Sequence, residues 1–81
     1  MFMNRWWKFV QRAVPPEVIA LLRLFKEHGF TAYIVGGALR DLLLGQIPAD
    51  WDLATDALPE TVEEICATHS AEGLKIIQVG K

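Results

Sequence analysis

The stretch from Tyr33 to Thr55 constrains the fold of this chain more than any other. Its sequence, YIVGGALRDLLLGQIPADWDLAT, contains an apolar run, two adjacent glycines, a leucine-rich segment, a third glycine, and two aspartates separated by one residue. An apolar run bounded by glycines is typical of a strand, and the leucine-rich segment is typical of a helix. This order of elements places backbone amides and two carboxylates at one end of a small sheet.

The two aspartates, Asp50 and Asp52, lie in a segment (50–54) where polar and apolar residues alternate. In a strand, this period of two sends both carboxylates to one face and Trp51 and Leu53 to the other. Magnesium prefers oxygen ligands and is commonly held by one or two carboxylates together with substrate phosphates. The pair is therefore a candidate cation site, and the alternative is a solvated acidic face.

The Gly36-Gly37 pair ends the predicted strand 30–35, which is apolar enough to be buried on both faces. The pair is either a turn that needs a positive φ angle, or a place where the backbone approaches a phosphate at the positive end of a helix over 38–44. Arg40, one turn into that helix, would add positive charge to the same phosphates or pair with a neighbouring carboxylate. The dinucleotide-binding and Walker glycine patterns are both absent.

Outside this stretch, the sequence predicts further helices and one more strand. An amphipathic helix begins at Pro16 and ends before Gly29, and another begins at Pro59. The last strand is expected at LKIIQV (74–79), after Gly73. The predicted fold class is α/β (α+β), a small mixed sheet flanked by helices in the order helix, strand, helix, strand, helix, strand.

The central helix has its own predicted boundaries and buried side. Gly45 is expected to cap its C-terminus. Its buried stripe is expected to be formed by three leucines: Leu39, Leu42 and Leu43.

Composition favours a single small globular domain. Of the 81 residues, 52% are hydrophobic, which excludes a disordered chain. The only cysteine, Cys66, cannot form an intrachain disulfide, so a reducing cytoplasmic setting is expected. No apolar run approaches the ~20 residues of a membrane span, and no membrane partner is expected.

Charge is distributed unevenly along the chain. Residues 1–40 carry six Lys/Arg and two Glu, whereas residues 41–81 carry eight Asp/Glu and two Lys. The segment before Val14 combines aromatic and basic side chains with no acid: Trp6, Trp7, Phe9, Arg5, Lys8 and Arg12. Such a helix either packs its aromatic residues on a neighbouring part of the protein or meets lipid or RNA phosphates. The consecutive prolines after Val14 separate residues 1–15 from a domain at 16–81.

Several spaced motifs together resemble one known family. They are Gly36-Gly37-Ala38-Leu39-Arg40-Asp41, Leu43-Leu44-Gly45, Pro48, Asp50-Trp51-Asp52 and Leu53-Ala54-Thr55. They resemble the head-domain signature of bacterial-type tRNA CCA-adding enzymes and poly(A) polymerases, members of the nucleotidyltransferase superfamily that includes DNA polymerase β. The resemblance covers about residues 16–81. It implies magnesium-dependent transfer of nucleotides from ATP or CTP to the 3′ end of tRNA or another RNA.

The resemblance also implies roles for individual residues. Asp50 and Asp52 would be the catalytic carboxylates that bind two Mg²⁺ ions, Gly36 and Gly37 would lie against the triphosphate, and Arg40 would help to fix the nucleotide. Asp41 is expected to pair with an arginine or the backbone.

In the family, a third acidic group and the base-selecting residues lie beyond the position of Lys81. The chain therefore resembles a truncated head domain, expected to be inactive alone and to expose a sheet edge that can pair with another copy. A non-catalytic nucleotide-binding or self-associating module is the main alternative. A stand-alone minimal nucleotidyltransferase is another.

Overall fold

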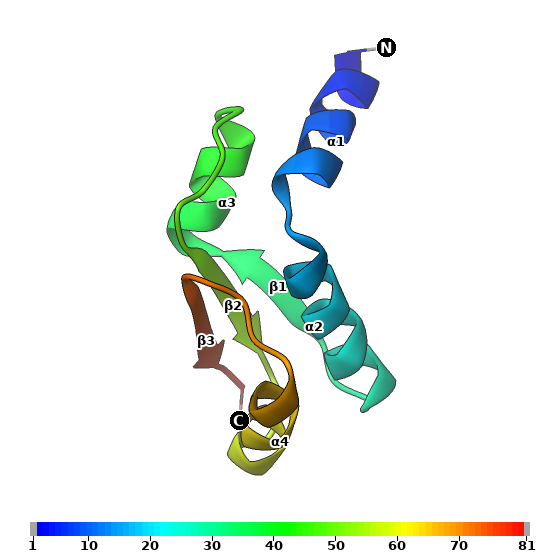
Figure 1. The fold of residues 1–81 in the computed structure, drawn as a ribbon, viewed down its shortest axis with the longest axis vertical. Helices are drawn as coiled ribbons and strands as arrows, with labels where there is room; N and C mark the ends of the chain where they lie inside the picture. The colour runs from blue at the N-terminus through cyan, green and yellow to red at the C-terminus, as the bar shows by residue number, and fades with distance from the viewer. Residues whose placement is uncertain (1, 81) are drawn as a thin grey trace.

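The computed structural model describes residues 2–80, with side chains from Arg5 onward (Figure 1). Met1, which begins the predicted segment 1–15, and Lys81, which ends the predicted domain 16–81, lie outside the described residues. The elements are α1 (Phe2–Ala13), α2 (Pro16–Glu27), β1 (Ala32–Val35), α3 (Gly36–Leu43), β2 (Trp51–Thr55), α4 (Pro59–Thr68) and β3 (Leu74–Gln78). The predicted order of elements is confirmed.

The three described strands form a mixed sheet in the order β1-β2-β3. β1 is antiparallel to β2, with Val35 opposite Asp52. β2 is parallel to β3, with Trp51 opposite Leu74, and α4 makes the crossover between them. The end of β1 and the starts of β2 and β3 therefore lie at the same end of the sheet, beside α3.

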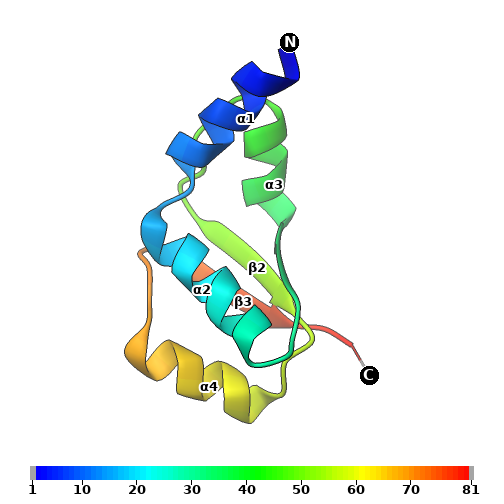
Figure 2. The same cartoon turned by 90° about the vertical axis from the view of Figure 1, so that its right-hand side faces the viewer.

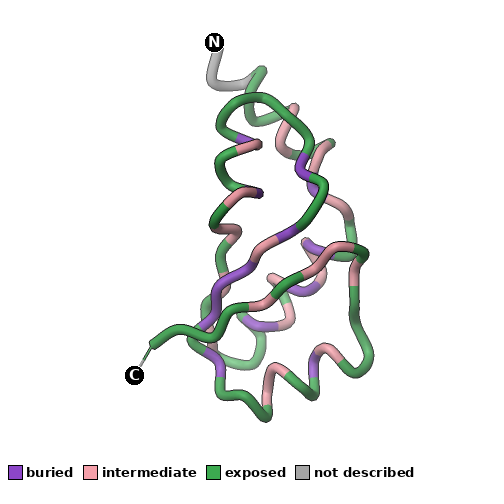
Figure 3. Tube along the Cα trace, turned by 90° about the vertical axis from the view of Figure 1, so that its left-hand side faces the viewer, coloured by how far each residue is buried: buried purple, intermediate pink, exposed green. Residues whose placement is uncertain are grey.

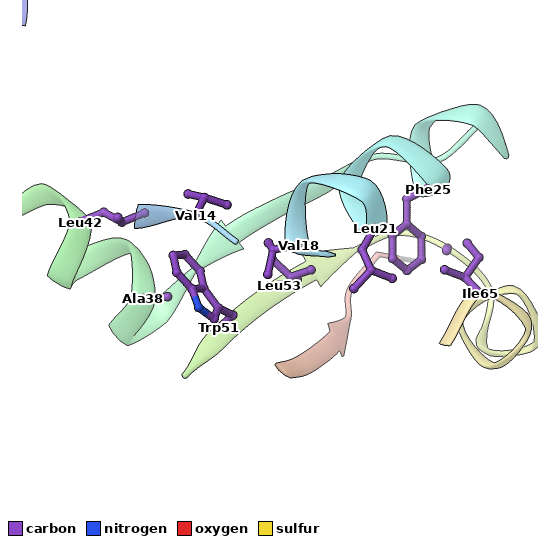
Figure 4. Packing of buried hydrophobic residues seen from close by; sticks show 10 residues of the cluster. Val14, Val18, Leu21, Phe25, Ala38, Leu42, Trp51, Leu53 and Ile65 are labelled. Atoms are coloured by element: carbon purple, nitrogen blue, oxygen red, sulfur yellow. The ribbon is translucent and has the colours of Figure 1, made fainter. Parts of the chain in front are cut away.

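One face of the sheet is covered by helices. α2 crosses in front of β2 and β3, and α4 lies below it (Figure 2). The strand residues that face these helices alternate along each strand and belong to the core: Ala32, Ile34, Trp51, Leu53, Leu74 and Ile76. They pack against Val18, Leu21 and Phe25 of α2 and Ile65 of α4 (Figure 4). Burying a side chain of this size stabilises the fold by about 1.5 to 3 kcal/mol.

Glycines terminate α2 and α3 as the sequence predicts. Gly45 has a φ angle of 74° and its amide donates to the carbonyl of Leu42 at 3.0 Å, while Gln46 donates to Asp41 at 2.8 Å. These two bonds define the Schellman motif, in which a residue in the left-handed region satisfies the last free carbonyls of a helix. Gly29 ends α2 with the same pair of bonds.

The predicted burial of the first strand on both faces is wrong. Tyr33, in the middle of β1, is 57% exposed. β1 is an edge strand, and the helices cover only the face that carries Ala32 and Ile34. β2, the central strand, is the most buried of the three, and its buried run crosses the middle of Figure 3.

The predicted stripe of α3 is correct only for Leu42. Leu39 and Leu43 are 40% and 62% exposed, whereas Ala38 and Leu42 are buried. Ala38 and Leu42 lie one turn apart and point toward Trp51 and Val14 (Figure 4). α3 touches the core along this single line, so the neighbouring side of the helix, with the other two leucines, remains in solvent.

The N-terminal segment is a helix packed on the rest of the chain. The indole nitrogen of Trp6 donates a 2.9 Å hydrogen bond to the carbonyl of Leu42 at the end of α3. Phe9 and Val10 pack against the core, and Val14 is buried. Packing on a neighbouring part of the protein is therefore the correct interpretation for Phe9 and Trp6, whereas Trp7 is 54% exposed. None of the described helices has both the length and the apolar character needed to cross a membrane.

Candidate nucleotide and metal site

The residues proposed from sequence gather where α3 begins and β2 starts. Gly37, Arg40, Asp50 and Asp52 line one open pocket of about 140 Å³, together with Ala38, Asp41 and Ala49. Gly36 lies at its rim beside Asp52. The pairing of Val35 with Asp52 explains this convergence, because it holds the last residue of β1 next to the second residue of β2.

The carboxylate of Asp52 lies against the glycine pair. A Cβ atom on Gly36 would be 3.2 Å from Asp52 Oδ2, and one on Gly37 would be 3.9 Å from the same oxygen. Gly36 also has a φ angle of 63°, in the region that side chains rarely adopt. The turn interpretation of this glycine is therefore confirmed, and the missing side chain also leaves room for the carboxylate.

Asp50 precedes β2, which begins one residue later than the sequence predicts. Its neighbour is Gly73, at the entry to β3, whose carbonyl accepts a 2.8 Å hydrogen bond from the amide of Trp51. A Cβ atom on Gly73 would lie 2.8 Å from the carbonyl oxygen of Ala49 and 3.0 Å from Asp50 Oδ1. Only a glycine fits there, and the sequence interpretation assigned it no part in the site.

Arg40 extends over the same turn. Its Nε lies 3.6 Å from Asp41 Oδ1, in agreement with the expected pairing of Asp41 with an arginine. The Arg40 side chain is 71% exposed, so this ion pair contributes only about 0 to 1 kcal/mol. Arg40 Nη2 also lies 3.4 Å from where a Cβ on Gly37 would be. The guanidinium is therefore held only weakly by Asp41, lies close to the glycine turn, and is accessible to an anion.

Lys75 is a second cation that the sequence pattern did not reveal. It is the β3 partner of Asp52 in the parallel ladder, and both residues alternate with core residues, so they share the face away from the helices. Lys75 is exposed. Its place beside the site depends on the β2–β3 register, which the local sequence pattern does not contain.

The carboxylates at this site fit a hard cation that takes its remaining ligands from a substrate. Asp50 and Asp52 offer carboxylate oxygens on a polar surface, opposite the apolar side occupied by Trp51 and Leu53. Within residues 2–80, no group of three or more His, Cys, Asp or Glu side chains is close enough to hold a metal alone. Two carboxylates plus phosphate oxygens are a common arrangement for Mg²⁺.

Residues 32–79 match the family described as the poly A polymerase head domain. The chain belongs to this head-domain family. All five site residues predicted from the sequence lie within the matched part of the head domain, while α1 and α2 precede it.

Curated proteins similar to this chain are named as CCA-adding enzymes or poly(A) polymerases. The chain is 48% identical over 65 residues to a CCA-adding enzyme of Bacillus pumilus, covering 80% of this chain and 14% of that protein. It is 58% identical over 49 residues to poly(A) polymerase I of Haemophilus influenzae, covering 60% of this chain and 11% of that protein. The predicted family is thereby confirmed.

A solved structure confirms the fold. The crystal structure of the Bacillus stearothermophilus CCA-adding enzyme in complex with CTP superposes with a TM-score of 0.64 at 34% sequence identity. The match covers 79% of this chain and 20% of that one. The matched part of this chain spans about a seventh or less of the length of the curated relatives cited.

Proposed function

We propose that this chain forms the metal- and triphosphate-binding end of an enzyme that transfers nucleotides from ATP or CTP to the 3′ end of tRNA or another RNA. The observation that carries the proposal is the single pocket lined by Asp50, Asp52, Gly37 and Arg40. The names of the relatives, and the CTP present in the similar crystal structure, support the same substrates.

Five residues in or beside the pocket have a part in this proposal. Asp50 and Asp52 supply carboxylate oxygens to Mg²⁺. Two such ions, when bound, stabilise the charge on the attacking and leaving oxygens of a phosphoryl displacement. Gly36 and Gly37 let the positive end of α3 approach the triphosphate closely. Arg40 adds a mobile positive charge to the phosphates.

In the reaction, the RNA 3′-hydroxyl attacks the α-phosphate and pyrophosphate leaves. Lys75, next to Asp52, adds positive charge on the same side of the sheet and helps to retain the nucleotide. Since the curated relatives are several times longer, we propose that the 81 residues bind nucleotide but do not transfer it alone. The cytoplasm, where tRNA and ATP are available, is the proposed location.

Calorimetric titration of the chain with CTP or ATP, in the presence of MgCl₂, tests the binding role. Asp52→Asn is expected to weaken magnesium-dependent binding at least tenfold, because the neutral amide is a poor ligand for a hard cation. Glu63→Gln is the matched control, since Glu63 is exposed on α4 and makes the same change of charge. Equal affinities for the wild type and Asp52→Asn would exclude a metal role for this carboxylate.

A transfer assay tests the catalytic part. The chain is incubated with labelled CTP or ATP, Mg²⁺ and a tRNA that lacks its 3′-terminal nucleotides. We expect no incorporation of label. Incorporation that Asp52→Asn abolishes would show instead that the 81 residues are a minimal enzyme in themselves.

Self-association is a second candidate function, supported by the free edge of β3. β3 ends the order of the described sheet, and Ile77 and Val79 are 51% and 44% exposed beside that edge. An unpaired strand edge is a template for a strand of another molecule. Sedimentation velocity between micromolar and millimolar concentration should show a concentration-dependent dimer, and a monomer throughout would exclude this function.

A further inference from the structure

The outer side of α1 carries a stripe of positive charge. Arg5, Lys8 and Arg12 recur at i, i+3 and i+7, so they lie within about 60° of one another around the helix at 100° per residue. All three are exposed. The stripe extends over about 10 Å along the axis at 1.5 Å per residue.

These cations have no internal partner among the described residues. The structure pairs none of the three with a carboxylate within 4.0 Å across residues 5–80. α1 itself contains no acidic residue, although residues 41–81 contain eight. A row of unpaired cations on an otherwise acidic chain is electrostatically complementary to a polyanion.

The packed side of α1 favours RNA over a lipid surface as the partner. An interfacial helix binds lipid by burying its apolar side in the bilayer. In this chain that side already contacts protein, through Trp6, which bonds to Leu42, and through Phe9 and Val10, which pack on the core. Trp7 is 54% exposed, so the free side of α1 carries an aromatic ring beside the three cations, and a phosphate backbone requires only their charge.

The position of α1 connects the stripe with the site. α1 lies beside the distal end of α3 (Figure 1), where Trp6 holds it to Leu42. α3 has eight residues, so its two ends are about 12 Å apart. Its other end is the glycine turn at the nucleotide pocket. A nucleic acid strand that ends in the pocket reaches the stripe within a few nucleotides, at a spacing of ~3.4 Å per stacked nucleotide.

From these observations we infer that Arg5, Lys8 and Arg12 form a phosphate-binding surface for an unpaired RNA strand whose 3′ end lies at the pocket. This inference rests on the proposed function for the identity of the RNA. The surface itself lies outside residues 32–79, which match the head-domain family.

The test measures RNA affinity by fluorescence anisotropy, with a labelled single-stranded RNA of about a dozen nucleotides and increasing salt. The double variant Arg5→Gln/Arg12→Gln removes two charges from the stripe and keeps good helix-forming residues. The matched control is Arg23→Gln/Lys26→Gln, which removes two exposed charges from α2. Exposed substitutions of this kind leave stability nearly unchanged, which thermal unfolding will verify.

The expected result is specific to the stripe. Each phosphate contact on a single strand contributes about 0.7 to the slope of log K against log salt, so the stripe variant should lower the slope by about 1.4 and the affinity roughly tenfold or more. The α2 variant should bind RNA as the wild type does. Equal losses in the two variants, or no binding of RNA by the wild type at low salt, would overturn the inference.

Two further measurements distinguish this inference from the proposed function and from binding to a lipid surface. CTP titration of the stripe variant should match the wild type. If RNA binding depends on the stripe while no variant binds CTP, the surface stands and the proposed function fails. Sedimentation with vesicles of phosphatidylglycerol and phosphatidylcholine tests the lipid alternative, and binding to vesicles without binding to RNA would overturn the inference.

Discussion

Replacing Gly73 with alanine should disturb the site from outside it. Gly73 has a φ angle of 73°, and a Cβ atom there would lie 2.8 Å from the Ala49 carbonyl oxygen and 3.0 Å from Asp50 Oδ1. The closest atom belongs to the backbone, so it cannot rotate away as a flexible side chain would. The loop before β2 must move, and it carries Asp50 with it.

The size of the effect follows from two contributions. A non-glycine residue in the left-handed region costs about 1 to 2 kcal/mol. Forcing an extra carbon into a tightly packed place costs about 1 to 3 kcal/mol more. Gly29→Ala is the matched control, since Gly29 has a φ angle of 89° but a Cβ atom added to it would have no neighbouring atom within 4 Å. It should show the first contribution alone.

Urea denaturation followed by circular dichroism measures the difference. Gly73→Ala should lower the free energy of unfolding by about 1 to 3 kcal/mol more than Gly29→Ala, or at least about 4 °C in Tm for a domain of this size. It should also weaken magnesium-dependent CTP binding, whereas Gly29→Ala should not. If the two variants lose equal stability and bind CTP equally, the contact between Gly73 and the Asp50 loop does not matter.

Three shorter predictions concern the packing around the sheet. Trp6→Phe should cost about 1 kcal/mol, measured by urea denaturation, because it removes the hydrogen bond to Leu42. Thr55→Val should cost about 1 to 3 kcal/mol, since the fully buried hydroxyl donates to the Thr31 carbonyl at 2.6 Å and its loss leaves that carbonyl without this donor; no loss of stability would contradict this. Burial raises the pKa of the Cys66 thiol, so this thiol ionises at a lower pH in the unfolded chain than in the folded one. The free energy of unfolding should therefore fall as the pH rises through the range in which the thiol ionises. Urea denaturation at several pH values should show a smaller fall in Cys66→Ser.

Local signals predicted much of this fold because their causes are local. Gly29 and Gly45 end helices through their own φ angles, and Pro16 and Pro59 begin helices because proline suits the first helical position. The alternation around Trp51 likewise predicts which side of β2 enters the core.

The errors concern properties that depend on distant parts of the chain. The apolar composition around Tyr33 is the same for an edge strand and for a central strand, and only the sheet order distinguishes them. The exposure of Leu39 and Leu43 follows from the narrow contact of α3 with the core. Gly73 lies beside Asp50, and Lys75 opposite Asp52, only through the pairing of β2 with β3, which the crossover through α4 creates.

The alternation of Trp51, Asp52 and Leu53 at the start of β2 also protects the site against misfolding. A strand that slips by one residue turns every side chain to the other face. In β2 such a slip would bury the carboxylate of Asp52 and expose Trp51 and Leu53, which are 4% and 0% exposed in the native register. Burying an unpaired carboxylate is so unfavourable that a domain with only about 5 to 15 kcal/mol of stability would not fold that way. The stability of the core therefore fixes the face of the sheet on which the Asp52 carboxylate lies.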